Sequence, residues 1–418
     1  MKTEIIAVGT ELLTPDFQDT NSLFLAAGLN AIGIEVSFKT VVGDDAGDLA
    51  RVLRTALGRS GLILCMGGLG PTEDDRTREV LAGVLGKKLV FHEEIAARIR
   101  ERFRRRGLPT PASNLKQSYV IEGAEILDNP HGTAPGLWLV AGRRRIALLP
   151  GPPKEIRPIF ENHVLPRLAG LGRGPVLRRV LRLTGLGESA METRLKPVYK
   201  IVPAEVTVTT LASPGDLSIR LSSSGREPQE AREARLDRIV RAIERALGPF
   251  IYSSDGAGLE AVVGAGLKER GLTIACAESC TGGLLGHRIT DVPGSSAYFL
   301  ESAVVYGNAA KARRLAVPKA LIEKHGAVSA AVARAMAAGI RRTSGADIGV
   351  AVTGIAGPDG GTPRKPVGLV YIALARARGT TVARSLFFGR REDVKFQSTQ
   401  KALDMIRKSL PAPSRKSL

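Results

Sequence analysis

The segment Ala275-Cys276-Ala277-Glu278-Ser279-Cys280-Thr281-Gly282-Gly283 gathers hydroxyl, thiol and carboxyl side chains in a turn without bulk. The apolar residues 271–275 before it predict a short buried strand, and residues 284–289 after it predict the start of a helix. A strand that enters a glycine-rich turn at a helix N-terminus points backbone N–H groups at an anion or an oxyanion. Alternatively, Ser279 and Thr281 only cap the helix, because both residue types are favoured N-caps. The segment alone favours neither interpretation.

Two further stretches supply partners for a nucleophile. Residues 305–311 bring Tyr306 and Lys311 together, and residues 350–361 form a second apolar strand followed by a glycine loop. A hydroxyl nucleophile needs a base, and no histidine lies in the three motifs, so Lys311 is the candidate. A lysine acts as a base only when burial or a neighbouring cation keeps it neutral. An isolated lysine is usually solvated and a glycine turn is often only a turn, but three such stretches in one short domain favour a site.

These motifs occur as AESCTGG (277–283), YGNAAK (306–311), HGAVS (325–329), TGIAGPDGG (353–361) and KPVGLVY (365–371). In this order they resemble the competence/damage-inducible protein A family, whose C-terminal domain is a nicotinamide mononucleotide amidohydrolase that needs no cofactor. The resemblance implies that Ser279 is the nucleophile and that Lys311 and Tyr306 activate it. It further implies substrate-binding roles for Glu278, Thr281, Gly282, Gly283, Asn308, Thr353, Gly354, Gly357 and Arg391.

The family pattern near the C-terminus is roughly F-x-G-D-R-E, and here residues 387–392 read FFGRRE. Arg391 aligns with the family arginine, which the resemblance assigns to the substrate phosphate. Arg390 stands where the family has an acid. The chain therefore departs from its pattern next to an expected ligand residue.

Length and composition limit the classes of protein. The 418 residues are too many for one ordinary core, so we expect two or three domains. With 44% hydrophobic and 24% charged residues, the composition is typical of soluble globular proteins. Three cysteines cannot form a disulfide framework, which favours a reducing cytoplasm. No long apolar region follows Met1, so we expect neither a signal peptide nor a membrane span.

The formal net charge of +19 at pH 7 is compatible with nucleic acid, acidic membranes or small anions as ligands. The densest basic run, Arg98–Arg106, contains a single aromatic residue and no recognisable nucleic-acid motif. A solvated helix face is the favoured explanation. We therefore expect no specific nucleic-acid partner.

Residues 1–170 alternate strands with helices, which predicts an α/β domain with a parallel sheet covered on both faces. The expected elements are strands at 4–8, 34–38 and 62–66 and helices at 21–30, 48–57 and 76–85. In such sheets ligands bind beyond the carboxyl ends of the strands. Two loops there combine glycines with carboxylates, a composition suited to phosphates and Mg²⁺. The alternative is that Asp74 and Asp75 form an acidic N-cap of the third helix.

These loops read GTELL (9–13), DTN (19–21) and GGLGPTEDD (67–75), and PGPP follows at 150–153. They resemble the molybdopterin-binding fold at the N-terminus of the same family, similar in role to a metal-dependent ADP-ribose pyrophosphatase. The resemblance implies a phosphate loop formed by Gly9, Thr10, Gly67, Gly68 and Gly70. It implies a divalent metal, Mg²⁺ or similar, with Asp74 and Asp75 as its ligands or as general bases and with Glu11 and Asp19 as secondary candidates.

Residues 171–254 predict strands at 176–184, 206–211 and 217–222 and an amphipathic helix at 230–247. This small α+β segment resembles the KH-like connector of the family, but it lacks the GXXG clamp of RNA-binding KH domains, which favours a spacer. Pro249 and Ser253–Gly256 predict a linker. The expected domains are 1–170, 171–254 and an α/β amidohydrolase domain at 255–418.

We expect an enzyme of pyridine nucleotide recycling that converts nicotinamide mononucleotide to nicotinic acid mononucleotide and ammonia. The competing interpretation is a non-catalytic nucleotide-sensing or competence-associated binding protein. Molybdopterin transfer rests only on the N-terminal fold, and fold does not fix function. The expected ligands are nicotinamide mononucleotide and ADP-ribose, and the expected assembly is a homodimer without a membrane partner.

Overall fold

The computed structural model describes residues 2–172, 174, 176–225 and 227–410; the basic tail after Leu410 lies outside these residues. The chain forms two compact units, one of Met1–Leu177 with Ser224–Pro228 and one of Arg178–Ser223 with Gln229–Leu418. Both alternate helices with strands, as expected for an α/β protein. No helix in the described residues is long and apolar enough to cross a membrane.

The N-terminal unit is built on a six-stranded sheet of order β2-β1-β3-β8-β7-β6. The first four strands are parallel and the last two are antiparallel. In β1, Ile5 and Ala7 belong to one core and Ile6 and Val8 to the other, because successive side chains point to opposite faces. Its strands are β1 (Thr3–Val8), β2 (Phe38–Val42), β3 (Leu62–Met66), β6 (Glu125–Leu127), β7 (Gly136–Ala141) and β8 (Arg144–Leu149).

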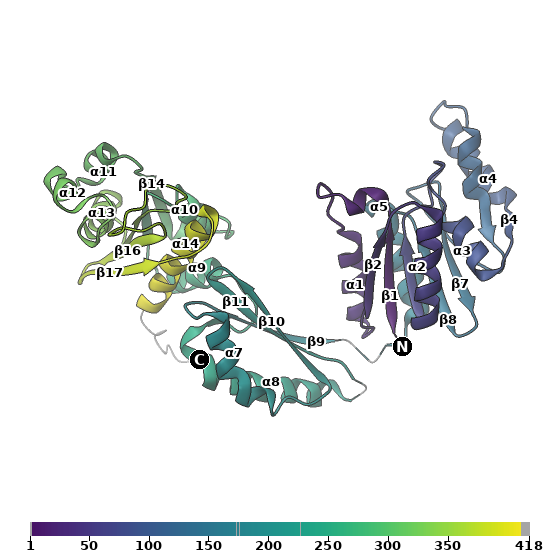
Figure 1. The fold of residues 1–418 in the computed structure, drawn as a ribbon, viewed down its shortest axis with the longest axis horizontal. Helices are drawn as coiled ribbons and strands as arrows, with labels where there is room; N and C mark the ends of the chain where they lie inside the picture. The colour runs from purple at the N-terminus through teal and green to yellow at the C-terminus, as the bar shows by residue number, and fades with distance from the viewer. Residues whose placement is uncertain (1, 173, 175, 226, 411–418) are drawn as a thin grey trace. The chain divides into compact units, whose positions relative to one another are not determined.

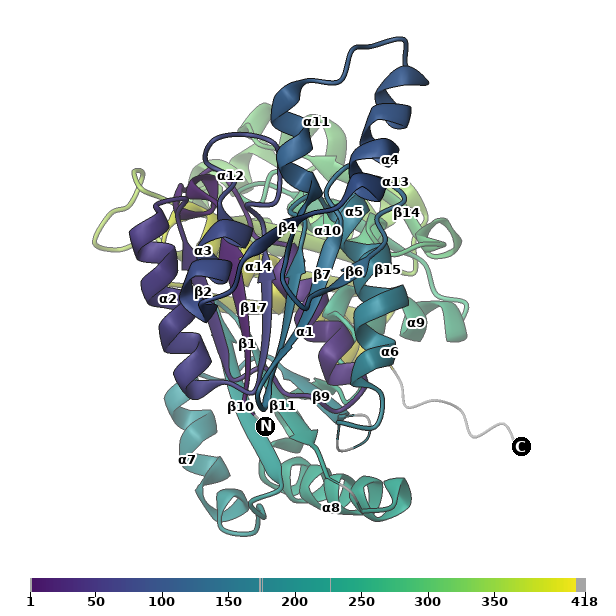
Figure 2. The same ribbon diagram turned by 90° about the vertical axis from the view of Figure 1, so that its right-hand side faces the viewer.

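Helices cover both faces of this sheet (Figure 1). Helices α1 (Asn21–Ala31), α5 (Pro153–Ile159) and α6 (Leu165–Leu168), with a π-helical turn at Phe160–Val164, pack in one core, and α2 (Ala46–Arg59), α3 (Thr77–Leu85) and α4 (Glu93–Arg104) pack in the other. Helix α4 projects beyond the end of the sheet (Figures 1 and 2). A separate antiparallel pair consists of β4 (Leu89–Phe91) and β5 (Tyr119–Ile121), and short 3-10 helices lie at Thr10–Leu13 and Ala112–Ser118.

The predicted strand at 34–38 is wrong, because β2 begins only at Phe38. Gly33 has a φ of +78° and turns the chain after α1, and the amide of Ile34 still donates to the carbonyl of Leu29 at 2.9 Å. The side chain of Ile34 is buried in the core beside α1. The apolar pattern at Ile34 therefore comes from the packing of a helix end and not from a strand.

The second unit contains a four-stranded sheet of order β10-β11-β9-β12. It consists of β9 (Leu177–Leu183), β10 (Val206–Ser213), β11 (Asp216–Ser223) and β12 (Ile251–Ser253), with helices α7 (Glu188–Tyr199) and α8 (Gln229–Leu247) and a 3-10 turn at Gly248–Phe250. The predicted linker around Ser253 is wrong, because β12 pairs with β9 in antiparallel register. Residues 251–253 therefore belong to the sheet of this α+β segment and do not form a free linker to the domain that follows.

The second sheet of this unit has the order β14-β13-β15-β16-β17. Helices α9, α10 and α14 pack in the core on one face, and α11, α12 and α13 pack in the core on the other. The elements are α9 (Leu259–Glu269), β13 (Ile274–Glu278), α10 (Leu284–Thr290), a 3-10 turn (Ser295–Ala297), β14 (Phe299–Val304), α11 (Asn308–Leu315), α12 (Lys319–His325), α13 (Ala330–Ser344), β15 (Ile348–Gly354), β16 (Leu369–Arg376), β17 (Gly379–Leu386) and α14 (Arg391–Ser409).

Strand β13 lies between β14 and β15 and is parallel to both, with Glu278 opposite Val304 and Val352. Parallel neighbours end at the same edge, so the segments after Glu278, Val304 and Gly354 meet there. The strand predicted at 271–275 is displaced, because Gly271 has a φ of +62° and belongs to the turn after α9. Glu278 is consequently the last strand residue rather than part of the turn.

Candidate functional site

Ser279 follows β13 directly and is fixed by the neighbouring strand. Its amide donates to the carbonyl of Val352 in β15 at 3.0 Å, and its side chain is buried. Lys311, in the first turns of α11, places its Nζ 3.1 Å from the Ser279 hydroxyl oxygen. The structure therefore brings together the two residues that the sequence proposed as nucleophile and base.

The environment of Lys311 favours its neutral form. The side chain is 1% exposed, and no carboxylate pairs with it in the described part of the chain. Burial lowers its pKa, and only the thiol of Cys280 opposes that shift. Nζ lies 2.9 Å from the carbonyl oxygens of Val305 and Tyr306. A neutral amine donates its two hydrogens to these carbonyls and leaves its lone pair for the Ser279 hydroxyl.

Cys280 is the competing nucleophile, and its surroundings disfavour the reactive form. The thiol packs in the core beside Cys276 and Leu285, away from solvent. Burial raises the pKa of Cys280 to about 12. A thiolate is the nucleophilic species, so this cysteine is unreactive near neutral pH.

Glu278 is wholly buried, and its carboxylate accepts hydrogen bonds from backbone amides at the start of α10. Its Oε2 accepts from the amides of Gly283 and Leu285, each at 3.0 Å, and its Oε1 accepts from the amide of Gly286 at 2.8 Å and the Ser302 hydroxyl at 2.9 Å. These four bonds occupy the lone-pair positions of the carboxylate. The first amides of the helix therefore face an anion that the chain itself supplies, and a ligand oxyanion would have to use the amides of the turn before them.

The capping interpretation of Ser279 and Thr281 is wrong. The N-cap of α10 is Gly283, and the side chain that accepts from the first amides of the helix is that of Glu278. The amide of Gly282 closes the turn on the Ser279 carbonyl at 3.1 Å. The amides of Cys280 and Thr281 donate to no backbone carbonyl among the described residues. They follow the nucleophile directly, where donors can stabilise an oxyanion.

The backbone carbonyl of Tyr306 accepts a hydrogen bond from Lys311, and the side chain of Tyr306 lies at the surface. Its ring is 63% exposed, and its hydroxyl accepts weakly from Nη2 of Arg391 at 3.4 Å. Arg391 also donates through Nη1 to the carbonyl of Gly357 at 2.7 Å. Arg391 thus joins the loop after β14 to the loop after β15 at the edge where Ser279 lies.

The other predicted ligand residues occupy different environments. Thr353 is buried, and its hydroxyl donates to the carbonyl of Ala327 at 2.9 Å. Gly354 packs so closely on β16 that a Cβ there would lie 2.8 Å from the carbonyl of Leu369. Asn308 is exposed at the start of α11. Of these three, only Asn308 has a side chain free to reach a ligand.

Arg390, at the position of the family acid, keeps the start of α14 intact. Its backbone amide donates to Asp393 Oδ2 at 2.8 Å. Its guanidinium pairs with the carboxylates of Glu392 and Asp393. The additional charge is therefore neutralised locally.

In the N-terminal unit, the loops after β1 and β3 pack together. Gly67 has a φ of +96°, and a Cβ there would overlap the carbonyl of Val8. Asp75 Oδ2 accepts from the Thr72 amide at 3.0 Å and from its hydroxyl. The acidic-cap interpretation of Asp74 and Asp75 is wrong, because the N-cap of α3 is Arg76 and no side chain caps it.

The four acids predicted to bind a metal do not converge. Asp19 accepts from the Ser22 amide at 2.9 Å, and the Glu11 carboxylate lies over Gly9. Among the described residues, no three His, Cys, Asp or Glu side chains could together hold a metal ion. Mg²⁺ in proteins is often held by one or two carboxylates together with substrate phosphates, and Asp74 and Asp75 are compatible with that mode.

Sequence reasoning missed Asp44, which follows β2 at the same edge. Its Oδ2 accepts from the amide and hydroxyl of Thr10, at 2.8 and 2.6 Å. The signal was available, because Gly43-Asp44-Asp45 ends the strand that neighbours β1. Asp44 therefore fixes the glycine loop that was predicted to bind phosphate.

A cavity lies elsewhere in the N-terminal unit. It measures about 680 Å³ and is lined by α4 and the segment 128–135. The basic run contributes Arg98, which pairs with Asp128 at 2.7 Å, and Arg102, which donates to the carbonyl of Gly132 at 2.9 Å. Arg102 packs on the chain, whereas the side chains of Arg98, Arg104 and Arg105 are exposed, as predicted for a solvated helix face.

Comparison with known proteins covers the whole chain. The family model "CinA C-terminal domain" matches residues 257–410, "Probable molybdopterin binding domain" matches residues 4–170, and "Damage-inducible protein CinA KH domain" matches residues 178–253. A CinA-like protein of Koribacter versatilis is 46% identical over 415 residues, covering 98% of this chain and 100% of that protein. One of Dictyoglomus thermophilum is 45% identical over 411 residues, covering 98% and 99%.

A crystal structure of a competence-damaged protein (CinA) superfamily protein from Klebsiella pneumoniae is 33% identical, covers 36% of this chain and 95% of that chain, and has a TM-score of 0.36. The full-length relatives and the three family models confirm the resemblance read from the motifs. With a parallel-sheet molybdopterin-binding-like domain, a KH-like connector and a C-terminal α/β domain that carries Ser279 and Lys311, the chain belongs to the CinA family.

Proposed function

We propose that the C-terminal domain hydrolyses the carboxamide of nicotinamide mononucleotide to nicotinic acid mononucleotide and ammonia. The observation that carries the proposal is a buried lysine, without a carboxylate partner among the described residues, 3.1 Å from a serine hydroxyl. A lysine held neutral by burial is the base that a serine nucleophile requires. The family membership of the domain supports the same activity.

In the first half of the reaction, Ser279 Oγ attacks the carboxamide carbon and its proton passes to Lys311 Nζ. The oxyanion accepts from the amides of Cys280 and Thr281, which donate to no backbone carbonyl among the described residues. Lys311 returns the proton to the departing amide nitrogen, the C–N bond breaks and ammonia leaves. In the second half, Lys311 takes a proton from water, hydroxide adds to the ester, and Ser279 leaves with that proton restored.

The alternative is a protein that senses nucleotides without turnover. Purified full-length protein incubated with nicotinamide mononucleotide should release ammonia and form nicotinic acid mononucleotide in equal amounts. Coupled ammonia detection and chromatography of the nucleotide measure both. Saturable binding of the nucleotide without ammonia would establish the sensor and exclude the hydrolase.

A second activity, divalent-metal-dependent hydrolysis of ADP-ribose, is proposed for the N-terminal unit. Its support is the close packing of the loops after β1 and β3, with Thr10 fixed by Asp44 and Asp75 bonded to Thr72. Asp74 and Asp75 would hold the metal together with substrate phosphates. The bound metal would supply charge stabilisation at the pyrophosphate.

A further inference from the structure

Helix α14 places two cations, Arg391 and Lys395, near the turn at residues 279–283, which we call the nucleophile turn. Arg391 is its first residue, and Lys395 follows at the i+4 position, so both side chains lie on one face of the helix. Lys395 Nζ lies 3.9 Å from the position that a Cβ on Gly282 would occupy. A residue far along the chain thus reaches the glycines next to Ser279.

The ammonium of Lys395 has no anionic partner among the described residues, although the side chain is half-buried. Arg390, at the N-cap of α14, pairs with Glu392 and Asp393, and Lys408 pairs with Asp404 at 2.7 Å, whereas Lys395 and Lys401 have no carboxylate partner among the described residues. A partly desolvated and unpaired ammonium attracts an anion. Lys395 and Arg391 together therefore form a positive edge beside the nucleophile turn.

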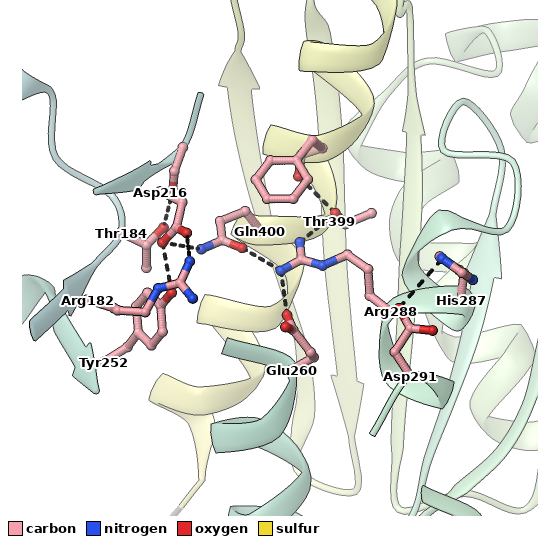
Figure 3. Close-up of polar contacts among 12 residues, drawn as sticks. Arg182, Thr184, Asp216, Tyr252, Glu260, His287, Arg288, Asp291, Thr399 and Gln400 are labelled. Atoms are coloured by element: carbon pink, nitrogen blue, oxygen red, sulfur yellow. Dashed lines mark hydrogen bonds and ion pairs between the residues drawn. The ribbon is translucent and has the colours of Figure 1, made fainter. Parts of the chain in front are cut away.

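The position of Lys395 is fixed by contacts between α10 and α14. Arg288 of α10 donates to Thr399 at 2.8 Å and to Gln400 at 2.7 Å, and it pairs with Glu260 of α9 at 2.7 Å (Figure 3). Its guanidinium also lies 4.6 Å from the ring centroid of Phe396, the residue after Lys395. Because α10 continues from the nucleophile turn, these contacts set the register of Lys395 against Gly282.

We propose that Lys395 adds a second cation to the phosphate site to which the family resemblance assigns Arg391, and that Lys395 makes the enzyme prefer the nucleotide to the corresponding nucleoside. This inference rests on the proposed amide hydrolysis. The guanidinium of Arg391 is directed by its bond to Gly357 and binds one edge of the phosphate, whereas Lys395 supplies a point charge. The base is Lys311, whose Nζ lies 3.1 Å from the Ser279 hydroxyl oxygen, so Lys395 is assigned a role in specificity and none in the chemistry.

The test compares two substrates with the full-length protein. Lys395→Gln should lower kcat/KM for nicotinamide mononucleotide by about 10- to 100-fold, the usual size of a lost charge-assisted hydrogen bond. For nicotinamide riboside, which lacks the phosphate, kcat/KM should change by less than about twofold. Lys395→Arg should retain most of the preference. Lys401→Gln, on the same helix, is the matched control and should leave both values unchanged.

Equal losses on both substrates would overturn the proposal, because they would show a structural role, and so would no loss on either. If the unmodified protein releases ammonia from neither substrate, the proposed hydrolysis fails, but the subsite remains testable. Inorganic phosphate titrated into both proteins by calorimetry should then bind more weakly to Lys395→Gln. Equal phosphate affinities, or no phosphate binding to the unmodified protein, would contradict the subsite on its own.

Discussion

Ser279 and Cys280 are adjacent and both buried, and it is their neighbours that separate them. The thiol packs in the core with a pKa raised to about 12, whereas the Ser279 hydroxyl faces Lys311. Sequence adjacency cannot choose between them, because both follow the strand directly and both are nucleophiles. The fold identifies Ser279 as the nucleophile, because α11 places the Lys311 amine beside the Ser279 hydroxyl.

The pH dependence of the proposed amide hydrolysis should follow the protonation of the Lys311 amine. Burial lowers the pKa of Lys311 below its ordinary value of 10.5, so kcat/KM should fall as pH falls through the lowered value and the base takes up a proton. Between the two values the unfolded chain binds a proton that the folded chain does not, so the free energy of unfolding should rise with pH. Lys311→Met should abolish both effects. A kcat/KM that is unchanged on the acid side would contradict the assignment.

Glu278 should act through the turn that it holds rather than through the substrate. In Glu278→Gln, the amide nitrogen must face backbone donors, which costs about 1–3 kcal/mol of stability for an unmet buried donor. We expect a lower Tm and a lower kcat with little change in KM, measured by calorimetry and steady-state kinetics. Glu301→Gln, exposed on β14, is the control. A raised KM with an unchanged Tm would instead indicate contact with substrate.

At the scale of elements, the sequence predicts what depends on local pattern. Strands β1 and β3, helices α8 and α10, and the two glycine loops lie where apolar periodicity and glycine place them. Strand β2 was misplaced because Ile34 packs a helix end with the apolar pattern of a strand. Local pattern also cannot show that Glu278 accepts the amides of α10 or that Lys395 reaches Gly282, since both contacts depend on tertiary packing.

Helix α3 carries a buried guanidinium that should lower stability. Arg78 is 1% exposed, burial lowers its pKa, and its three guanidinium nitrogens have no hydrogen-bond partner among the described residues. Replacing a buried, unsatisfied charge with an apolar side chain of similar length removes its desolvation cost. Arg78→Met should therefore raise the free energy of unfolding of the N-terminal unit by about 1–3 kcal/mol.

Calorimetry of the full chain measures this change. Arg54→Met on the exposed surface of α2 is the control, and it should leave the unfolding midpoint nearly unchanged. A lower midpoint for Arg78→Met would show that the guanidinium has a partner, such as a bound anion.

At the scale of the whole molecule, the two candidate sites belong to separate compact units. Asp75→Ala should therefore abolish hydrolysis of ADP-ribose and leave ammonia release from nicotinamide mononucleotide unchanged. Hydrolysis of ADP-ribose should need a divalent cation and stop in chelator. Nucleotide chromatography and ammonia detection measure the two activities in one preparation. ADP-ribose hydrolysis that persists in chelator would contradict the metal role.

The central claim is that this chain uses Ser279, activated by a neutral Lys311, to hydrolyse the carboxamide of nicotinamide mononucleotide. The most direct measurement is the rate of ammonia release by the full-length protein, by Ser279→Ala and by Cys280→Ala. We predict that Ser279→Ala loses about a thousandfold or more, as removal of a nucleophile does in triad enzymes, and that Cys280→Ala keeps most of the activity. Near-normal ammonia release by Ser279→Ala together with an inactive Cys280→Ala would contradict the account.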